Sequence, residues 1–286
     1  LVGKVNSIGS WNGEEATIRG QVSLASAKIL DYDLTDVTGP FRVEKGILLF
    51  GAGDSQKVPP LMAQVFGGAL ELDGAATLAD PPEYEIVMRL NKARLERFAA
   101  LHAPKQRDLR GVVDAGVRLK GKGSTPQGVV GAGRMEINRA ALLEMPVMLQ
   151  IYQGLRLTPP ADHTFKSAEL NFGIKNARFD FKSIVLHGDA ISFVGNGTAD
   201  FDSNVRLKFY SFLPRNQIPV PILRELVGEA TKGWVRADVS GKLADPIVNI
   251  QPSSPIDDTL KNLLGVIPQQ IFPIGQGLML KGASRQ

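Results

Sequence analysis

The sequence contains no cysteine, only three histidines, and few tyrosines or tryptophans. Without cysteine the chain has no disulfide bond, no thiolate nucleophile and no cysteine-based zinc site. His102, His163 and His187 lie far apart in the sequence and lack the spacing of metal ligands. No stretch approaches the ~18 consecutive apolar residues of a membrane-spanning helix. We therefore expect no metal site and no transmembrane helix in this sequence.

Familiar enzyme motifs are also missing. Gly131-Ala-Gly133 lacks the third glycine of a dinucleotide-binding fingerprint. The segment from Gly51 to Lys57 lacks the spacing of a phosphate-binding loop, and Asp31, Asp33 and Asp36 lack the glycine and glutamate of an EF-hand. We predict a protein that is not an enzyme, with no catalytic residues and no cofactor. A hydrolase or lyase whose scattered carboxylates converge on a β-scaffold is the enzymatic alternative.

The charge pattern bears on partners. The formal net charge is +4, and the lysines and arginines are spread along the chain rather than clustered. Because nucleic-acid binding needs a concentrated basic patch, we predict no nucleic-acid partner and give more weight to an anionic lipid surface.

What the sequence has in excess is glycine, with 30 residues, alongside 18 prolines. This composition favours many short strands joined by turns. The stretch from Phe165 to Phe209 illustrates the pattern, because apolar residues alternate with polar ones through three consecutive segments. The apolar positions slip from odd to even numbers around Lys182 and Ser183, which predicts a β-bulge there. We predict a mostly β fold built on a large antiparallel sheet.

Short helices interrupt this pattern. A helix is predicted near residues 91–102, with Asn91 as its cap. A second helix is predicted after Asn138, kinked or shortened by Pro146. A third, amphipathic helix is predicted after Ser254. The predicted regions are an N-terminal segment over 1–108, a central segment over 109–252 and a C-terminal tail over 253–286. The sequence starts at Leu1 without a methionine or leader, so we expect it to be part of a longer protein.

One face of the predicted sheet is apolar throughout. Such a face must be covered, either by another layer of protein or by an apolar ligand such as acyl chains, and alternation alone leaves both open. If the cover is lipid, the candidate lining residues are the apolar members of the strands: Tyr84, Ile86, Met88, Leu90, Val113, Val117, Leu119, Leu170, Phe172, Phe179, Phe181, Ile191, Phe193, Phe201 and Leu207.

Several segments resemble the C-terminal region of the AsmA-like family. They are Gly121-Lys-Gly123, the run from Gly131 to Ile137, the helix over Leu142 to Leu149, the Phe165–Phe201 meander with Gly195-Asn-Gly197, and Val239-Ser-Gly241-Lys-Leu243-Ala-Asp245-Pro246. The resemblance covers residues 109–252 well and the first hundred residues loosely. The family has no catalytic signature.

The resemblance implies an elongated, curled antiparallel β-sheet whose concave side is a half-open apolar β-groove. It also implies a periplasmic protein of a Gram-negative bacterium, attached to the inner membrane by an N-terminal anchor that this sequence lacks. Its role would be bridge-like phospholipid transport toward the outer membrane in envelope biogenesis. The predicted C-terminal helix suits either a membrane-surface contact or a plug over the end of the groove. The alternative is a scaffold or assembly factor that binds an envelope protein partner through exposed strand edges.

Overall fold

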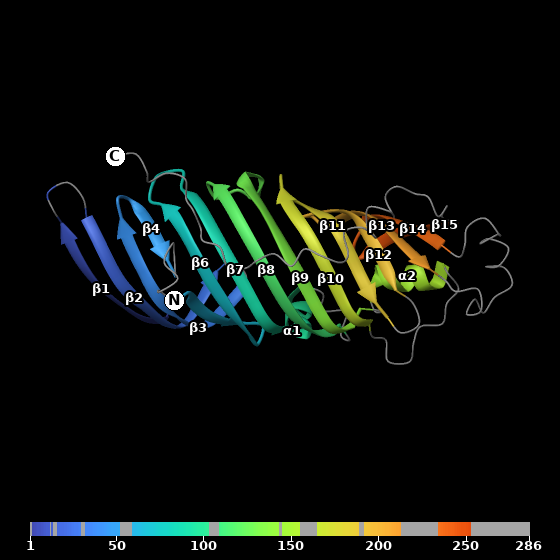
Figure 1. The fold of residues 1–286 in the computed structure, drawn as a ribbon, viewed down its shortest axis with the longest axis horizontal. Helices are drawn as coiled ribbons and strands as arrows, with labels where there is room; N and C mark the ends of the chain where they lie inside the picture. Colours follow the sequence, from blue (N-terminus) through green and yellow to red (C-terminus); the bar gives the residue numbers. More distant parts are fainter. Residues whose placement is uncertain are drawn as a thin grey trace. The chain divides into compact units, whose positions relative to one another are not determined.

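The protein is mostly β, as predicted (Figure 1). The structure, a computed structural model, describes residues 2–11, 13, 16–29, 32–51, 59–102, 109–142, 145–154, 165–188, 192–212 and 234–252. Within these ranges fifteen strands form one antiparallel sheet, and two short α-helices, α1 and α2, accompany it. The prediction of one large antiparallel sheet with few short helices is confirmed.

The strands follow one another in the sheet in nearly the order of the sequence. Their bounds are β1 Val2–Trp11, β2 Ala16–Ile29, β3 Tyr32–Glu44, β4 Ile47–Phe50, β5 Leu61–Val65, β6 Gly68–Thr77, β7 Glu83–Arg94, β8 Arg110–Lys122, β9 Val129–Ala141, β10 Phe165–Lys175, β11 Arg178–His187, β12 Phe193–Asp200, β13 Asn204–Phe212, β14 Trp234–Lys242 and β15 Asp245–Pro252. A single 3-10 turn, η1, spans Pro126–Gly128.

Strand β5 is the one exception to this simple order. It pairs with both β3 and β6, and so does the short strand β4. The two strands therefore occupy one position between β3 and β6. Strand β4 ends at Phe50, and β5 begins at Leu61. Directly after β4 the Gly51 backbone N–H donates a hydrogen bond to the Pro40 carbonyl, over 3.1 Å.

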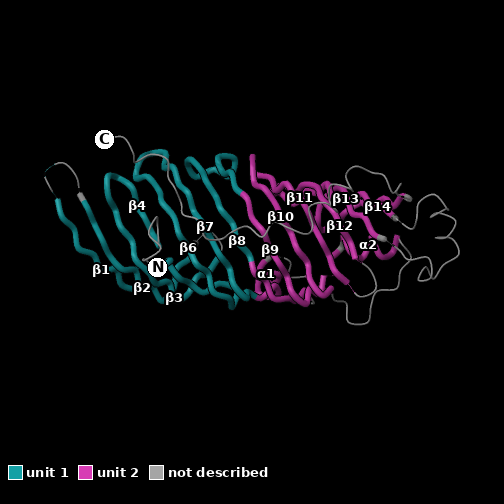
Figure 2. The backbone as a smooth tube through the Cα atoms, in the orientation of Figure 1, with its two compact units in different colours: residues 1–93, 115–131, 271–286 teal, residues 94–114, 132–270 magenta. Residues whose placement is uncertain are grey.

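Two compact units divide the chain (Figure 2). The first includes the described residues up to Ala93 together with Ala115–Gly131, and the second includes Arg94–Asp114 and the described residues from Ala132 onward. The predicted boundaries at 108/109 and 252/253 stay predictions, and the tail over 253–286 with its predicted helix lies outside the described residues.

The bulge predicted near Lys182 and Ser183 is confirmed. The pairing of β11 with β12 shifts register between Phe181 and Ile184, and the pairing of β10 with β11 shifts between Asn171 and Phe172. The shifts keep Ile184 and Leu186 on the same face as Phe181, so that the apolar side of the sheet is continuous across the slip in the sequence.

The helices differ from their predicted positions. Strand β7 continues to Arg94, and α1 spans Leu95–His102, so Asn91 belongs to the strand and is not a helix cap. The second helix does not start after Asn138, where β9 continues to Ala141; α2 spans Pro146–Gly154 and begins at the proline that was expected to kink or shorten it. Proline is favoured at a first helical position because its fixed φ suits the helix and its missing N–H would have no partner there.

The two units bury different cores. In the first unit a small buried cluster, Ala27, Leu34, Val37, Ala63 and Val65, gathers on β2, β3 and β5. In the second unit, α2 packs against the sheet, and its Val147, Met148, Ile151 and Tyr152 are buried. The C-terminal end of α2 contacts β15 so closely that a side chain at Gly154 would meet Ile250 at 2.5 Å.

Candidate functional site

The apolar face of the first unit is centred on the hairpin of β6 and β7. Leu70 lies opposite Leu90, Leu72 opposite Met88, Gly74 opposite Ile86, and Ala76 opposite Tyr84. Four predicted residues, Tyr84, Ile86, Met88 and Leu90, thus share one face with Leu70 and Leu72, and all are half-buried. The hairpin forms because its two segments alternate apolar and polar residues on either side of the prolines at 81 and 82.

Aromatic rings on this face lie over glycines of neighbouring strands. A Cβ built on Gly121 would be 2.3 Å from Tyr84 Cζ, one on Gly74 would be 2.5 Å from Phe50 Cζ, and one on Gly20 would be 2.5 Å from Phe41 Cε1. Each ring occupies the space that a side chain would otherwise fill. The glycines therefore leave room for the rings close to the backbone of the neighbouring strand.

This face extends over several strands of the first unit. Phe41 pairs with Phe50, and Val43 pairs with Leu48, which carries the apolar side from β6 to β3. On β8, Val117 and Leu119 are half-buried and alternate with the exposed Arg118 and Lys120. Among the described residues of this unit, no α-helix is present to cover the sheet. The apolar side chains of this face are half-buried, and two of them, Leu70 and Leu90, pack against the buried cluster of β2, β3 and β5.

The opposite face of the same strands is charged. The Glu85 carboxylate is only 7% exposed and pairs with Lys120 Nζ at 3.0 Å and with Arg118 Nε at 4.0 Å. Arg89 Nη1 donates to Asp73 Oδ2 at 3.2 Å. At the end of the row, a hydrogen bond from Lys122 and its charge lower the pKa of Glu83 below its ordinary value. These pairs give ionic partners to the carboxylates of this side, of which Asp73 and Glu85 are buried.

The second unit carries a phenylalanine cluster on β10, β11 and the β12–β13 turn. Phe172 makes edge contacts with Phe179 and Phe181, with ring centroids 5.6 and 6.2 Å apart, and Phe201 approaches Phe179 at 5.2 Å. Phe201 is 46% exposed. The turn that holds it is fixed by a hydrogen bond from Phe201 N to the Ala177 carbonyl, at 3.1 Å. All four residues were predicted, and the structure brings them together.

Other predicted residues belong to the core of the second unit. Phe193 is 1% exposed and contacts Phe165 of β10 and Tyr152 of α2, with ring centroids 6.3 and 6.1 Å away. Burial of Tyr152 raises the pKa of its hydroxyl to about 12. Val113 is buried, Leu170 and Leu207 are half-buried, and Ile191 lies outside the described residues. In this structure Phe193 is accessible to no ligand, because α2 covers it.

Phe41, Phe50 and their glycine partners were not among the predicted site residues. Their signal in the sequence is weak, because an aromatic residue and the glycine beneath it sit on different strands. Only the register, Phe41 opposite Gly20 and Phe50 opposite Gly74, brings them together.

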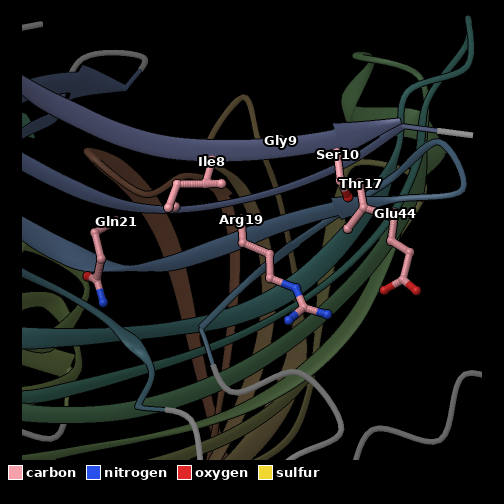
Figure 3. A pocket seen from close by; sticks show the side chains of 8 residues that line it. Ile8, Gly9, Ser10, Thr17, Arg19, Gln21 and Glu44 are labelled. Carbon is pink, nitrogen blue, oxygen red and sulfur yellow. The ribbon is translucent and has the colours of Figure 1, made fainter. Parts of the chain in front are cut away.

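A hollow of about 650 Å³ lies on the polar side of β1, β2 and β3 (Figure 3). Ile8, Ser10, Thr17, Arg19, Gln21 and Glu44 line it. Glu44 also pairs with Arg42 at 3.3 Å. The hollow is widely open and has a mixed polar and apolar lining, and it is on the other side of the sheet from the apolar face described above.

The described residues offer little for bond-making chemistry. They contain no group of three histidine, aspartate or glutamate side chains placed to hold a metal ion. Neither of their helices has the length and apolar character needed to cross a membrane. What the first unit does offer is a two-sided sheet, with half-buried apolar side chains on one side and charged side chains on the other.

No protein family, curated protein or solved structure matches the chain.

Proposed function

We propose that this protein binds phospholipid acyl chains along the apolar face of its first unit and moves lipids through the periplasm of a Gram-negative bacterium, between the inner and outer membranes. The observation that carries the proposal is the half-buried apolar face over β3, β4, β6, β7 and β8 in the first unit, a unit to which neither described α-helix belongs. Membership of residues 109–252 in the AsmA-like family, from which the periplasmic location is taken, is part of this proposal.

The energetics favour a lipid ligand. Each methylene that leaves water is worth about 0.8 kcal/mol, so an acyl chain gains several kcal/mol by lying along partly open apolar side chains. Rings that lie over glycines, such as Tyr84 over Gly121, present no ridge that would hold the chain in one place. A ligand that is held only by the burial of apolar surface, without a specific polar contact, can slide along the face. The headgroup stays in water beyond the edge of the apolar face.

Native mass spectrometry with lipid extraction tests the proposal on the 286-residue chain purified from a Gram-negative host. The test variant carries Leu72→Gln and Met88→Gln, which lie directly opposite each other on the apolar face. The control is Val87→Thr, which is next to Met88 on the same strand but on the charged face, opposite Asp73. Circular dichroism melts establish that each variant folds.

We expect phospholipid to accompany the wild type and the Val87→Thr control, and to be lost or strongly reduced in the double glutamine variant. A folded wild type free of lipid contradicts the proposal. So does a folded double variant that retains as much lipid as the wild type.

A scaffold that acts through an exposed strand edge is the second candidate function. The observation that favours it is β1, whose ten residues are all exposed and which stands at one end of the strand order. Lipid-free protein that captures an outer-membrane β-protein during refolding, and loses this ability when β1 is deleted, would support this candidate.

A further inference from the structure

Helix α1 turns its large apolar side chains outward. Phe98 and Leu101 are 40% and 57% exposed, whereas Ala99, between them in the sequence, is buried. Because Phe98 and Leu101 are three residues apart on a helix, they lie on the same side of it. A helix that only packs against a sheet places its large apolar residues toward the sheet and its polar residues toward water. The arrangement in α1 is the reverse, so packing within the chain does not explain it.

Helix α2 of the same unit follows the usual rule (Figure 1). Its Val147, Met148, Ile151 and Tyr152 are buried, and Leu149 is its one large apolar residue that is exposed. The sheet of the second unit can therefore cover the apolar side of a helix, and it does so for α2. The contrast indicates that the outward side of α1 serves a contact outside the chain.

The sheet does not need α1 to connect its strands. Strands β7 and β8 are neighbours in the antiparallel sheet, yet β7 ends at Arg94 and β8 begins only at Arg110. Strands β10 and β11, which are also neighbours, are joined by residues 176–177 alone. Two residues suffice to join antiparallel strands, and longer connections often carry function. Helix α1 is thus an addition to the sheet rather than a requirement of it.

Basic side chains accompany the outward apolar ones. Arg97 is exposed and is four residues from Leu101, so it lies on the same side of the helix. Arg94, directly before the helix, is 61% exposed, and its Nη1 is 3.3 Å from Glu96 Oε1. The exposed residues over 94–101 are two arginines, a phenylalanine, a leucine and an alanine, and none of them is acidic. This surface is complementary to one that is both apolar and negatively charged.

A bilayer that contains anionic phospholipid presents such a surface. Phenylalanine and leucine are typical of helices that lie in the membrane interface, where their side chains reach the boundary between headgroups and acyl chains. A guanidinium group can bind two phosphate oxygens at once, and basic residues near an anionic membrane surface are attracted to it. The apolar and basic side chains of α1 would therefore both find partners there.

We propose that α1 is a membrane-surface helix, which inserts Phe98 and Leu101 into the interface of an anionic phospholipid bilayer while Arg94 and Arg97 bind lipid phosphates. This contact is separate from the apolar face of the first unit and does not depend on the proposed function. If that function holds, α1 holds the protein at the membrane with which it exchanges lipid.

Vesicle flotation of the 286-residue chain tests the proposal. The wild type should float with vesicles of phosphatidylglycerol and phosphatidylcholine, and much less with phosphatidylcholine alone. Phe98→Ser with Leu101→Ser should weaken binding about tenfold, because the inserted apolar area is lost. Arg97→Gln should weaken it about fivefold, because one charge near the membrane surface is removed.

Two control variants accompany the flotation assay. Leu149→Ser removes an exposed leucine from α2 and should float like the wild type. Leu72→Gln with Met88→Gln, which tests lipid binding by the first unit, should also float like the wild type, so the two proposals can fail separately. Circular dichroism melts establish that each variant folds.

A fluorescent label provides a direct readout of insertion, since the chain has no native cysteine. Nitrobenzoxadiazole on Leu101→Cys should brighten and shift to the blue when phosphatidylglycerol vesicles are added, whereas the same label on Leu149→Cys should not change. Equal flotation with neutral vesicles, no flotation, or undiminished binding of the double serine variant overturns the proposal. So does a Leu101→Cys signal that appears when unlabelled protein is added without lipid, because a second copy would then cover this side of α1.

Discussion

Glycines beneath aromatic rings shape the apolar face at the level of single residues. Tyr84 over Gly121, Phe50 over Gly74 and Phe209 over Gly195 repeat one arrangement in both units. A glycine inside a strand weakens the strand, because it contributes no side chain and costs more conformational entropy. Here the neighbouring ring replaces the missing side chain. The high glycine content of the chain therefore reflects packing as well as turns.

A valine substitution at Gly121 should destabilise the protein. The new Cβ would be 2.3 Å from Tyr84 Cζ, so the ring must leave the sheet. Overpacking of this kind costs about 1 to 3 kcal/mol. Gly116→Val on the same strand is the control, because nothing lies within 4 Å of its Cβ, and its stability should change little or increase. Chemical denaturation measures both, and equal losses would contradict this account of Gly121.

At the scale of elements, the alternation of apolar and polar residues predicted most of the strands and the bulge in β11. It could do so because successive side chains of a strand point to opposite faces, so the sequence of each strand alone shows which residues lie on the apolar face. The positions of the helices were harder to predict. Asn91 resembles a helix cap, yet its pairing with Ala69 keeps it in β7, and that pairing depends on the preceding strand, β6, rather than on the residues next to Asn91.

The candidate site could be predicted only in part for the same reason. Alternation identified which residues share a face, and Tyr84, Ile86, Met88 and Leu90 do share one. It could not show what covers that face. Phe172 and Phe193 follow the same pattern in the sequence, but α2 covers Phe193, while Phe172 joins a cluster that reaches the exposed Phe201. The difference is set by tertiary packing.

Helix α2 should contribute to stability through one side only. Ile151 is fully buried against the second unit, whereas Leu149 is 38% exposed. Ile151→Ala should lose about 2 to 5 kcal/mol, as is typical for a large buried aliphatic side chain cut to alanine. Leu149→Ala, two residues away on the same helix, should lose much less. Thermal unfolding of the two variants compares them, and a similar loss at Leu149 would mean that α2 does not pack in this way.

For the molecule as a whole, the separation of an apolar face from a charged face predicts how ligand binding responds to salt. Burial of acyl chains is not screened by salt, whereas attraction between a mildly basic protein and anionic headgroups is screened over about 10 Å at 0.1 M. The affinity for a fluorescent fatty-acyl probe should therefore stay constant or rise as sodium chloride increases. Fluorescence titration measures it, and a steep fall with salt would show that charge, rather than the apolar face, holds the ligand.

The nearly sequential order of the strands also has a kinetic consequence. Most strands pair with the strand that precedes or follows them in the chain, so the sheet is built mainly from consecutive hairpins. Proteins with sequence-local contacts fold faster than those with distant pairings, since each hairpin closes only a short loop. Folding can begin at any hairpin and spread by addition of one strand at a time. An added or deleted hairpin would change the number of strands without changing the route by which the others assemble.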